Sequence, residues 1–92
     1  MRVLWPPSAL RDIWRIYDYA AAFNPRAATK LAEALIAAAD SLAEFPHRGR
    51  PVAGTAMREL VVVRPYIIRY EVRSDEVWII RIRHGAQRPT TP

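Results

Sequence analysis

The order of hydrophobic and polar positions predicts a helical first half of the chain. Apolar residues recur at helical spacing between residues 7 and 22, with charged residues between them: Leu10, Ile13, Trp14, Tyr17 and Ala21. A second apolar stripe predicts another helix from Asn24-Pro25 to residue 44. So short a connection makes the pair an αα-hairpin. A short strand over residues 2–5 is expected to precede it.

From residue 57 onward the apolar period changes to two, which is typical of strands. We expect antiparallel strands over residues 57–63, 66–73 and 76–84, with a tight turn at Ser74 and Asp75. Residues 47–56 are expected to form a loop, and residues 87–92 a flexible tail. The predicted fold class is α+β, in which an N-terminal strand and a helical hairpin pack on a small antiparallel sheet. Residues 1–92 are expected to form one domain.

Alternation within the strands separates two faces of the predicted sheet. One face is aromatic and aliphatic, as in Tyr66, Ile68 and Tyr70, and should pack on the helices. The other face combines cations with aliphatic side chains: Ile67, Arg69, Arg73, Val77, Ile79, Arg81 and Arg83. Arg58 and Arg64 are expected to lie beside it on the first strand. A surface that is both cationic and apolar is typical of a binding surface.

Charge strengthens this interpretation, because the formal net charge of +5 lies entirely after residue 46. Arginine supplies thirteen of the fourteen cations, and its planar fork suits phosphate and carboxylate ligands. The chain has no cysteine and two histidines, so we expect neither metal nor cofactor. The sequence has no run of eighteen apolar residues, so no membrane segment is expected and the cytoplasm is the expected location.

Several short motifs, in their order and spacing, resemble the RelE/ParE toxin superfamily over nearly the whole chain. They are Ile16-Tyr17-Asp18-Tyr19, Asn24-Pro25, Leu42-Ala43-Glu44-Phe45-Pro46 with Gly49-Arg50, Arg58-Glu59-Leu60, residues 66–70, and Ile79-Ile80-Arg81-Ile82-Arg83-His84-Gly85. The resemblance implies a toxin of a type II toxin–antitoxin pair, neutralised by a cognate antitoxin. ParE-like members inhibit DNA gyrase, whereas RelE-like members cut mRNA on the ribosome.

If the chain is a nuclease, its candidate catalytic residues are Arg58, Arg81, Arg83 and His84. Arginine can stabilise a charged phosphate intermediate but is a poor general base, because it stays protonated. The sequence departs from the nuclease pattern at three points. Gly85 follows His84 where such members have tyrosine, Ile67 follows Tyr66 where they have arginine, and the tail has no tyrosine.

We therefore predict a ParE-like toxin that binds a protein target and does not catalyse. The alternative is a ribosome-dependent mRNA endoribonuclease of the RelE type, and a third interpretation is a degenerate member that binds only its antitoxin. An antitoxin segment with acidic and apolar side chains would match the cationic and apolar face. The predicted partner-binding residues are Arg64, Ile67, Arg69, Arg73, Ile79, Arg81 and Arg83.

Overall fold

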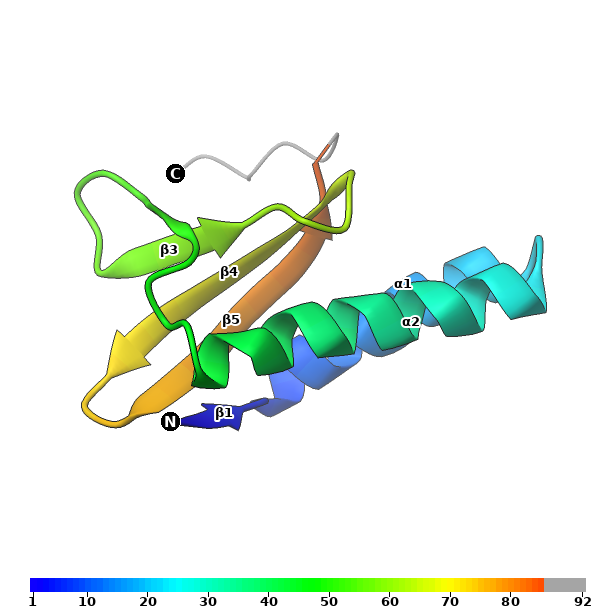
Figure 1. Ribbon diagram of the computed structural model, residues 1–92. Helices are drawn as coiled ribbons and strands as arrows, with labels where there is room; N and C mark the ends of the chain where they lie inside the picture. Colours follow the sequence, from blue (N-terminus) through cyan, green and yellow to red (C-terminus); the bar gives the residue numbers. More distant parts are fainter. Residues whose placement is uncertain (86–92) are drawn as a thin grey trace.

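Two helices pack on one face of a five-stranded sheet in the computed structural model, which describes residues 1–85 (Figure 1). The tail expected at residues 87–92 lies outside the described part of the chain. The elements in chain order are β1 (Arg2–Leu4), α1 (Pro7–Ala21), α2 (Pro25–Asp40), a 3-10 turn (Ser41–Ala43), β2 (Arg50–Pro51), β3 (Met57–Leu60), β4 (Tyr66–Arg73) and β5 (Glu76–His84). This arrangement confirms the predicted α+β class.

The helical hairpin forms where its local chemistry predicts it. The side chain of Asn24 accepts the N–H of Ala27 at 3.2 Å, and Pro25 occupies the first position of α2, where it loses no hydrogen bond. Leu35 and Ala39 on α2 and Ile13 on α1 are buried in the core that the helices share with the sheet. The tip of the hairpin extends beyond the strands in Figure 1.

The sheet has the strand order β1-β5-β4-β3-β2. β1 runs parallel to β5 and pairs only with Glu76–Trp78, whereas β5, β4, β3 and β2 are antiparallel neighbours. The C-terminal half of β5 therefore forms an edge beside α1. β3 ends at Leu60, earlier than expected, so that Arg64 lies in the connection to β4 and not on a strand.

A bulge in β5 changes the faces that the sequence pattern assigns to this strand. Arg69 pairs with Arg81, but the next β4 residue, Tyr70, pairs with Ile79, so that Ile80 is the extra residue. The alternation shifts there, and Val77 and Ile79 are buried with 0% exposure. The prediction that both lie on the open side of the sheet is wrong, and Ile79 has no surface with which to contact a partner.

Tyr70 fixes the loop that leads from the helices into the sheet. Its buried hydroxyl donates to the carbonyl of Pro46 and accepts the N–H of Gly49, both at 2.8 Å. A Cβ atom at Gly49 would lie 2.7 Å from the Tyr70 ring, so this close approach requires glycine. Burial raises the pKa of Tyr70, which keeps its hydroxyl protonated as the donor.

None of the helices in the described part of the chain has the length and apolarity of a membrane-spanning segment.

Candidate functional site

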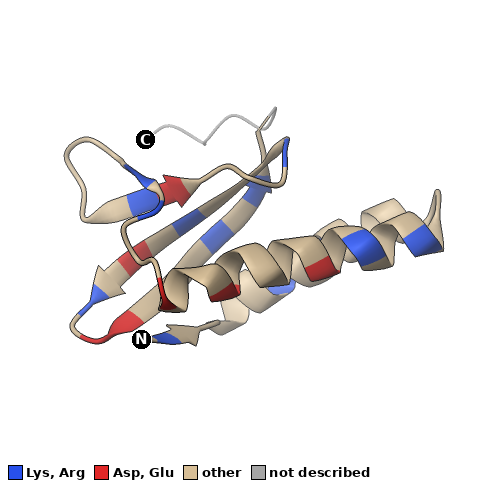
Figure 2. Cartoon of the chain, in the orientation of Figure 1, with Lys and Arg blue, Asp and Glu red and all other residues tan. Residues whose placement is uncertain are grey.

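The sheet surface opposite α1 and α2 carries most of the predicted cationic positions, and we call it the open face. Glu59 on β3 lies opposite Arg69 on β4, and Ile67 on β4 lies opposite Arg83 on β5. Figure 2 shows cationic positions on the neighbouring strands β4 and β5. Strand pairing thus brings together on the open face three residues that the sequence pattern assigned to it.

Glu59 lies at the centre of an arginine cluster formed by Arg50, Arg69 and Arg83. Its Oε2 atom accepts hydrogen bonds from Nε of Arg69 at 3.1 Å and from Nη2 of the same residue at 2.7 Å. Arg83 Nη2 lies 3.8 Å from Oε2, and Arg50 Nη2 lies 3.7 Å from Oε1. Glu59 is only 8% exposed, so the carboxylate is held inside the cluster it neutralises. The shortest contact of Glu59 is to Arg69, which donates from both Nε and Nη2.

Arg73 lies at the far end of the open face. Its guanidinium stacks over the Trp78 ring at 4.9 Å from the ring centre and donates to Glu71 at 2.9 Å. The hydrogen bond to Glu71 raises the pKa of Arg73 above its ordinary value. Because Arg73 is at an exposed strand end, it is accessible to a partner but already has two neighbours.

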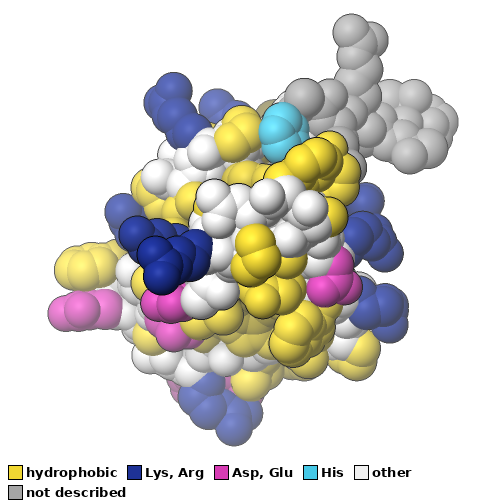
Figure 3. Space-filling model, turned by 90° about the vertical axis from the view of Figure 1, so that its right-hand side faces the viewer, with side chains coloured by type: hydrophobic (Ala, Val, Ile, Leu, Met, Phe, Trp, Pro, Cys, Tyr) yellow, Lys and Arg dark blue, Asp and Glu magenta, His cyan; other side chains and the backbone are white. Residues whose placement is uncertain are grey.

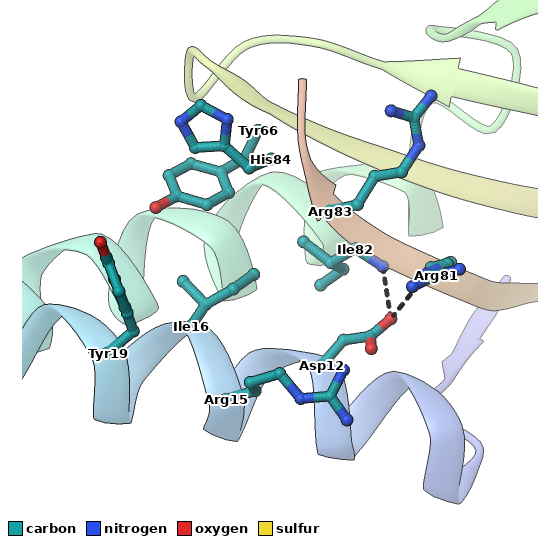
Figure 4. A pocket seen from close by; sticks show the side chains of 9 residues that line it. All are labelled: Asp12, Arg15, Ile16, Tyr19, Tyr66, Arg81, Ile82, Arg83 and His84. Atoms are coloured by element: carbon teal, nitrogen blue, oxygen red, sulfur yellow. Dashed lines mark hydrogen bonds and ion pairs between the residues drawn. The ribbon is translucent and has the colours of Figure 1, made fainter. Parts of the chain in front are cut away.

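A cleft of about 480 Å³, which we call the edge cleft, lies where the C-terminal half of β5 meets α1 (Figure 4). Its lining residues are Asp12, Arg15, Ile16, Tyr19, Tyr66, Arg81, Ile82, Arg83 and His84. The Oδ2 atom of Asp12 accepts the backbone N–H of Ile82 at 2.9 Å and lies 3.9 Å from Nε of Arg81. A side chain of α1 thus occupies a hydrogen-bonding position on the edge of β5.

Aromatic side chains form the other end of the edge cleft. The rings of Tyr66 and His84 meet edge to face, with centres 5.3 Å apart, and Tyr19 on α1 lies across from them (Figure 4). Tyr19 is 71% exposed and contacts Phe23, whose ring centre is 5.4 Å away. Seen from the side where the hairpin ends, hydrophobic side chains gather in a band with cations at its sides (Figure 3). The lining of the edge cleft itself combines these aromatic rings with the cations of Arg15 and Arg81.

Arg58, predicted as a candidate catalytic residue, binds backbone carbonyls within the fold. It lies opposite Tyr70 in the β3–β4 pairing and so is on the core side of the sheet. Its Nη1 atom donates to the carbonyl of Gly49 at 2.8 Å and to that of His47 at 3.4 Å. The expectation that Arg58 belongs to the open face is therefore wrong. Arg64 is exposed in the connection after β3, apart from the sheet surface.

Three of the four candidate catalytic residues share the edge cleft, whereas Arg58 lies on the core side of the sheet. Arg81, Arg83 and His84 all line the edge cleft, but the side chain of Arg83 turns away from Asp12 and Arg81 in Figure 4 and approaches Glu59. Within residues 1–85, no group of three or more His, Asp or Glu side chains could hold a metal ion.

Sequence reasoning missed Glu59 and Asp12, the two carboxylates that organise the site. Glu59 stands in an alternating strand, but its position among arginines follows from the register of three strands. Asp12 is one of several charged residues on the polar side of a predicted helix, and only the packing of α1 against β5 gives it a partner. No local signal in the sequence distinguishes either residue.

Three comparisons with known proteins agree with this fold over most of the chain. A model of the family described as "ParE toxin of type II toxin-antitoxin system, parDE" matches residues 3–89. "Toxin RelE2" of Caulobacter vibrioides is 52% identical over 86 residues, covering 94% of this chain and 97% of that relative. "Toxin RelE1" of the same organism is 39% identical, covering 94% and 95%. The solved structure titled "Chromosomal ParDE TA system from P. aeruginosa" is 26% identical with a TM-score of 0.81, covering 91% of this chain and 95% of its own.

Proposed function

As the chain belongs to the ParE toxin family of type II toxin–antitoxin systems, within the RelE/ParE superfamily, we propose that it inhibits DNA gyrase by binding and without catalysis. The observation that carries this proposal is the dispersal of the candidate catalytic residues. Arg58 holds loop carbonyls, Arg83 approaches Glu59, and Arg81 approaches Asp12. Three of the four candidate side chains thus each contact a different group of the chain itself.

A gyrase assay tests this target. Purified toxin, gyrase, ATP and relaxed plasmid are incubated together, and the products are separated on an agarose gel. We expect the toxin to block supercoiling or to trap cleaved DNA. Unimpaired supercoiling together with cuts in mRNA codons at the ribosomal A site of a translation extract would overturn the proposal. Inactivity in both assays would mean that the chain only binds its antitoxin.

The RelE-type activity remains the second candidate because His84, Tyr66 and Arg81 share one cleft. Histidine is the most common general acid or base in enzymes, so His84 is the candidate for this role. If the toxin does cut mRNA, the variant His84→Gln should remove the cuts while leaving the free energy of unfolding within about 1 kcal/mol of the wild type. Cuts that persist in this variant would exclude His84 as the acid or base.

A type II toxin implies a cognate antitoxin partner. We propose that an acidic and apolar antitoxin segment places its acidic groups at Arg81 in the edge cleft, and its apolar groups along the adjoining open face at Ile67 and the aliphatic stems of Arg69 and Arg83. Three arginines against one aspartate in the cleft give it a cationic excess, and Ile16 with the tyrosines supplies the apolar contact. Arg64 and Arg73 lie further out and would contribute at the periphery.

Charge reversal tests this surface. We expect Arg81→Glu to weaken antitoxin binding by roughly tenfold or more, measured by calorimetry, because a rim cation becomes a like charge against an acidic segment. The matched control is Arg26→Glu at the start of α2, which changes the net charge equally at an exposed position on the hairpin. Equal loss of affinity in both variants would contradict the proposed surface.

A further inference from the structure

The arginine cluster has the composition of an anion-binding site, but its centre is a carboxylate of the chain itself. Three guanidinium groups approach Glu59, at 2.7 Å for Arg69, 3.7 Å for Arg50 and 3.8 Å for Arg83. The formal charge of these four side chains is therefore +3 − 1, or +2. Planar arginine forks bind carboxylate and phosphate oxygens with the same geometry. The three arginines are already arranged to bind an external anion, but the Glu59 carboxylate lies in the central position.

Burial keeps the Glu59 carboxylate at the centre of the arginine cluster. The Glu59 side chain is 10% exposed, and the side chains of Arg83 and Arg69 are 14% and 28% exposed. A carboxylate that is so enclosed stays in place because it would lose its charged hydrogen bonds with Arg69 if it turned outward. The ion pair of Arg73 with Glu71, in contrast, lies at an exposed end of the same face.

The cluster is nevertheless open to solvent on one side. A hollow of about 270 Å³ lies beside Glu59 and is lined by Arg48, Arg50, Glu59, Leu60, Val61 and Val62. Arg50 is the most exposed member of the cluster, with 71% of its side chain accessible. A ligand phosphate could therefore approach Arg50 and the Glu59 position from the β2 side of the sheet.

We propose that Glu59 occupies an anion-binding site built by Arg50, Arg69 and Arg83, and that it thereby keeps the open face from binding the phosphodiester groups of single-stranded nucleic acid. Glu59 is in this sense a specificity-determining residue. Its carboxylate repels a phosphate and satisfies the arginines that would bind it. The proposal concerns the charge pattern of the chain itself and holds whether or not gyrase is the target.

The variant Glu59→Gln tests the proposal, because it keeps the size of the side chain and removes its charge. We expect a fluorescently labelled single-stranded RNA octamer to bind E59Q roughly tenfold or more tightly than it binds the wild type at low salt, measured by anisotropy. The dependence of log affinity on log salt should steepen by about 0.7 for each additional phosphate that the variant neutralises.

The matched control is Glu71→Gln, which removes one negative charge from the same face but leaves the cluster intact. A general effect of net charge would appear equally in E71Q and would overturn the proposal. Wild-type protein that already binds the octamer as tightly as E59Q would also overturn it. The gyrase assay reads a different property, so failure of either proposal can be told from failure of the other.

If E59Q does not fold, the wild type itself provides the test by nuclear magnetic resonance. Inorganic phosphate is titrated into the protein while the signal of the Arg69 Nε–H is followed. We expect the signal to stay in place, because Glu59 already accepts this N–H. A shift that saturates with phosphate would mean that the site is open to external anions, and the proposal would be wrong.

Discussion

Removal of the Tyr70 hydroxyl is expected to destabilise the protein more than its single oxygen atom suggests. In Tyr70→Phe, the ring still fills its buried place between sheet and loop, so packing is preserved. The N–H of Gly49 and the carbonyl of Pro46 each lose a partner at 2.8 Å. Gly49 is buried, so its N–H has no access to replacement water.

The expected loss in the free energy of unfolding follows from the two backbone groups that lose their hydrogen-bond partner. A buried donor left without a partner costs about 1–3 kcal/mol, and the partly accessible carbonyl costs less, so we expect a loss of about 2–3 kcal/mol in the free energy of unfolding. For a domain of this size, that loss lowers Tm by roughly 8–24 °C. Urea denaturation followed by circular dichroism measures the loss, with the m-value expected to stay unchanged.

The matched control is Tyr19→Phe, since Tyr19 is 71% exposed and its hydroxyl has abundant water. This variant should change the free energy of unfolding by less than about 0.5 kcal/mol. If Tyr70→Phe costs no more than Tyr19→Phe, the hydroxyl does not hold the loop and the reasoning is refuted.

The same hydroxyl gives a signature at high pH. Burial raises the pKa of Tyr70 above its ordinary value of 10.0, because the interior disfavours the phenolate. Tyr70 therefore contributes stability that is fully present below that value and is lost as the pH rises toward the folded-state pKa. The stability difference between wild type and Tyr70→Phe should shrink above about pH 10, the ordinary tyrosine pKa. A difference that stays constant to about pH 11, one unit above that ordinary value, would contradict this assignment.

Four further substitutions test the packing around the site. Ile79→Ala should cost about 2–5 kcal/mol and Ile80→Ala under about 1.5 kcal/mol in urea denaturation, since the bulge buries only the first fully; the reverse order would refute the bulge. Asp12→Ala should accelerate amide hydrogen exchange at Ile82 by roughly tenfold or more, because a charge-assisted acceptor is lost, and an unchanged rate would show that this bond contributes nothing. Gly49→Ala should cost about 1–3 kcal/mol in the free energy of unfolding, because the new Cβ atom would lie 2.7–2.8 Å from the buried Tyr70 ring and a backbone carbonyl. A variant as stable as the wild type would mean that the loop adapts.

The parts of the fold that the sequence predicts correctly depend on local chemistry. Asn24 caps the helix that begins at Pro25 and continues with a stripe of apolar residues. The two-residue turn at Ser74 and Asp75 joins two strands that pair Arg73 with Glu76. Each of these features needs only neighbouring residues. They suffice for the hairpin, for the pairing of β4 with β5, and for the α+β class.

The bulge in β5 could not be predicted in this way. Ile79 and Ile80 are the same residue type in adjacent positions, so hydrophobicity gives no reason to bury one and not the other. The choice depends on how β5 meets β4 at Tyr70 and Arg69, which is a property of the paired strands. One extra residue reverses the face of every earlier position in the strand, and this reversal removes Ile79 from the binding surface.

The arginines in the second half of the chain are less available to an external anion than the net charge suggests. In the described structure, Glu59 has three arginines within 4 Å, and Asp12 approaches Arg81 from the other half of the chain. The Glu59 carboxylate does not cancel the positive charge of the arginine cluster. It does occupy the centre of the cluster, where the guanidinium groups meet. A partner then gains most from the exposed margins of the open face and from the edge cleft. We expect the same arginines to become a phosphate site only when Glu59 loses its charge, and this expectation is independent of the gyrase proposal.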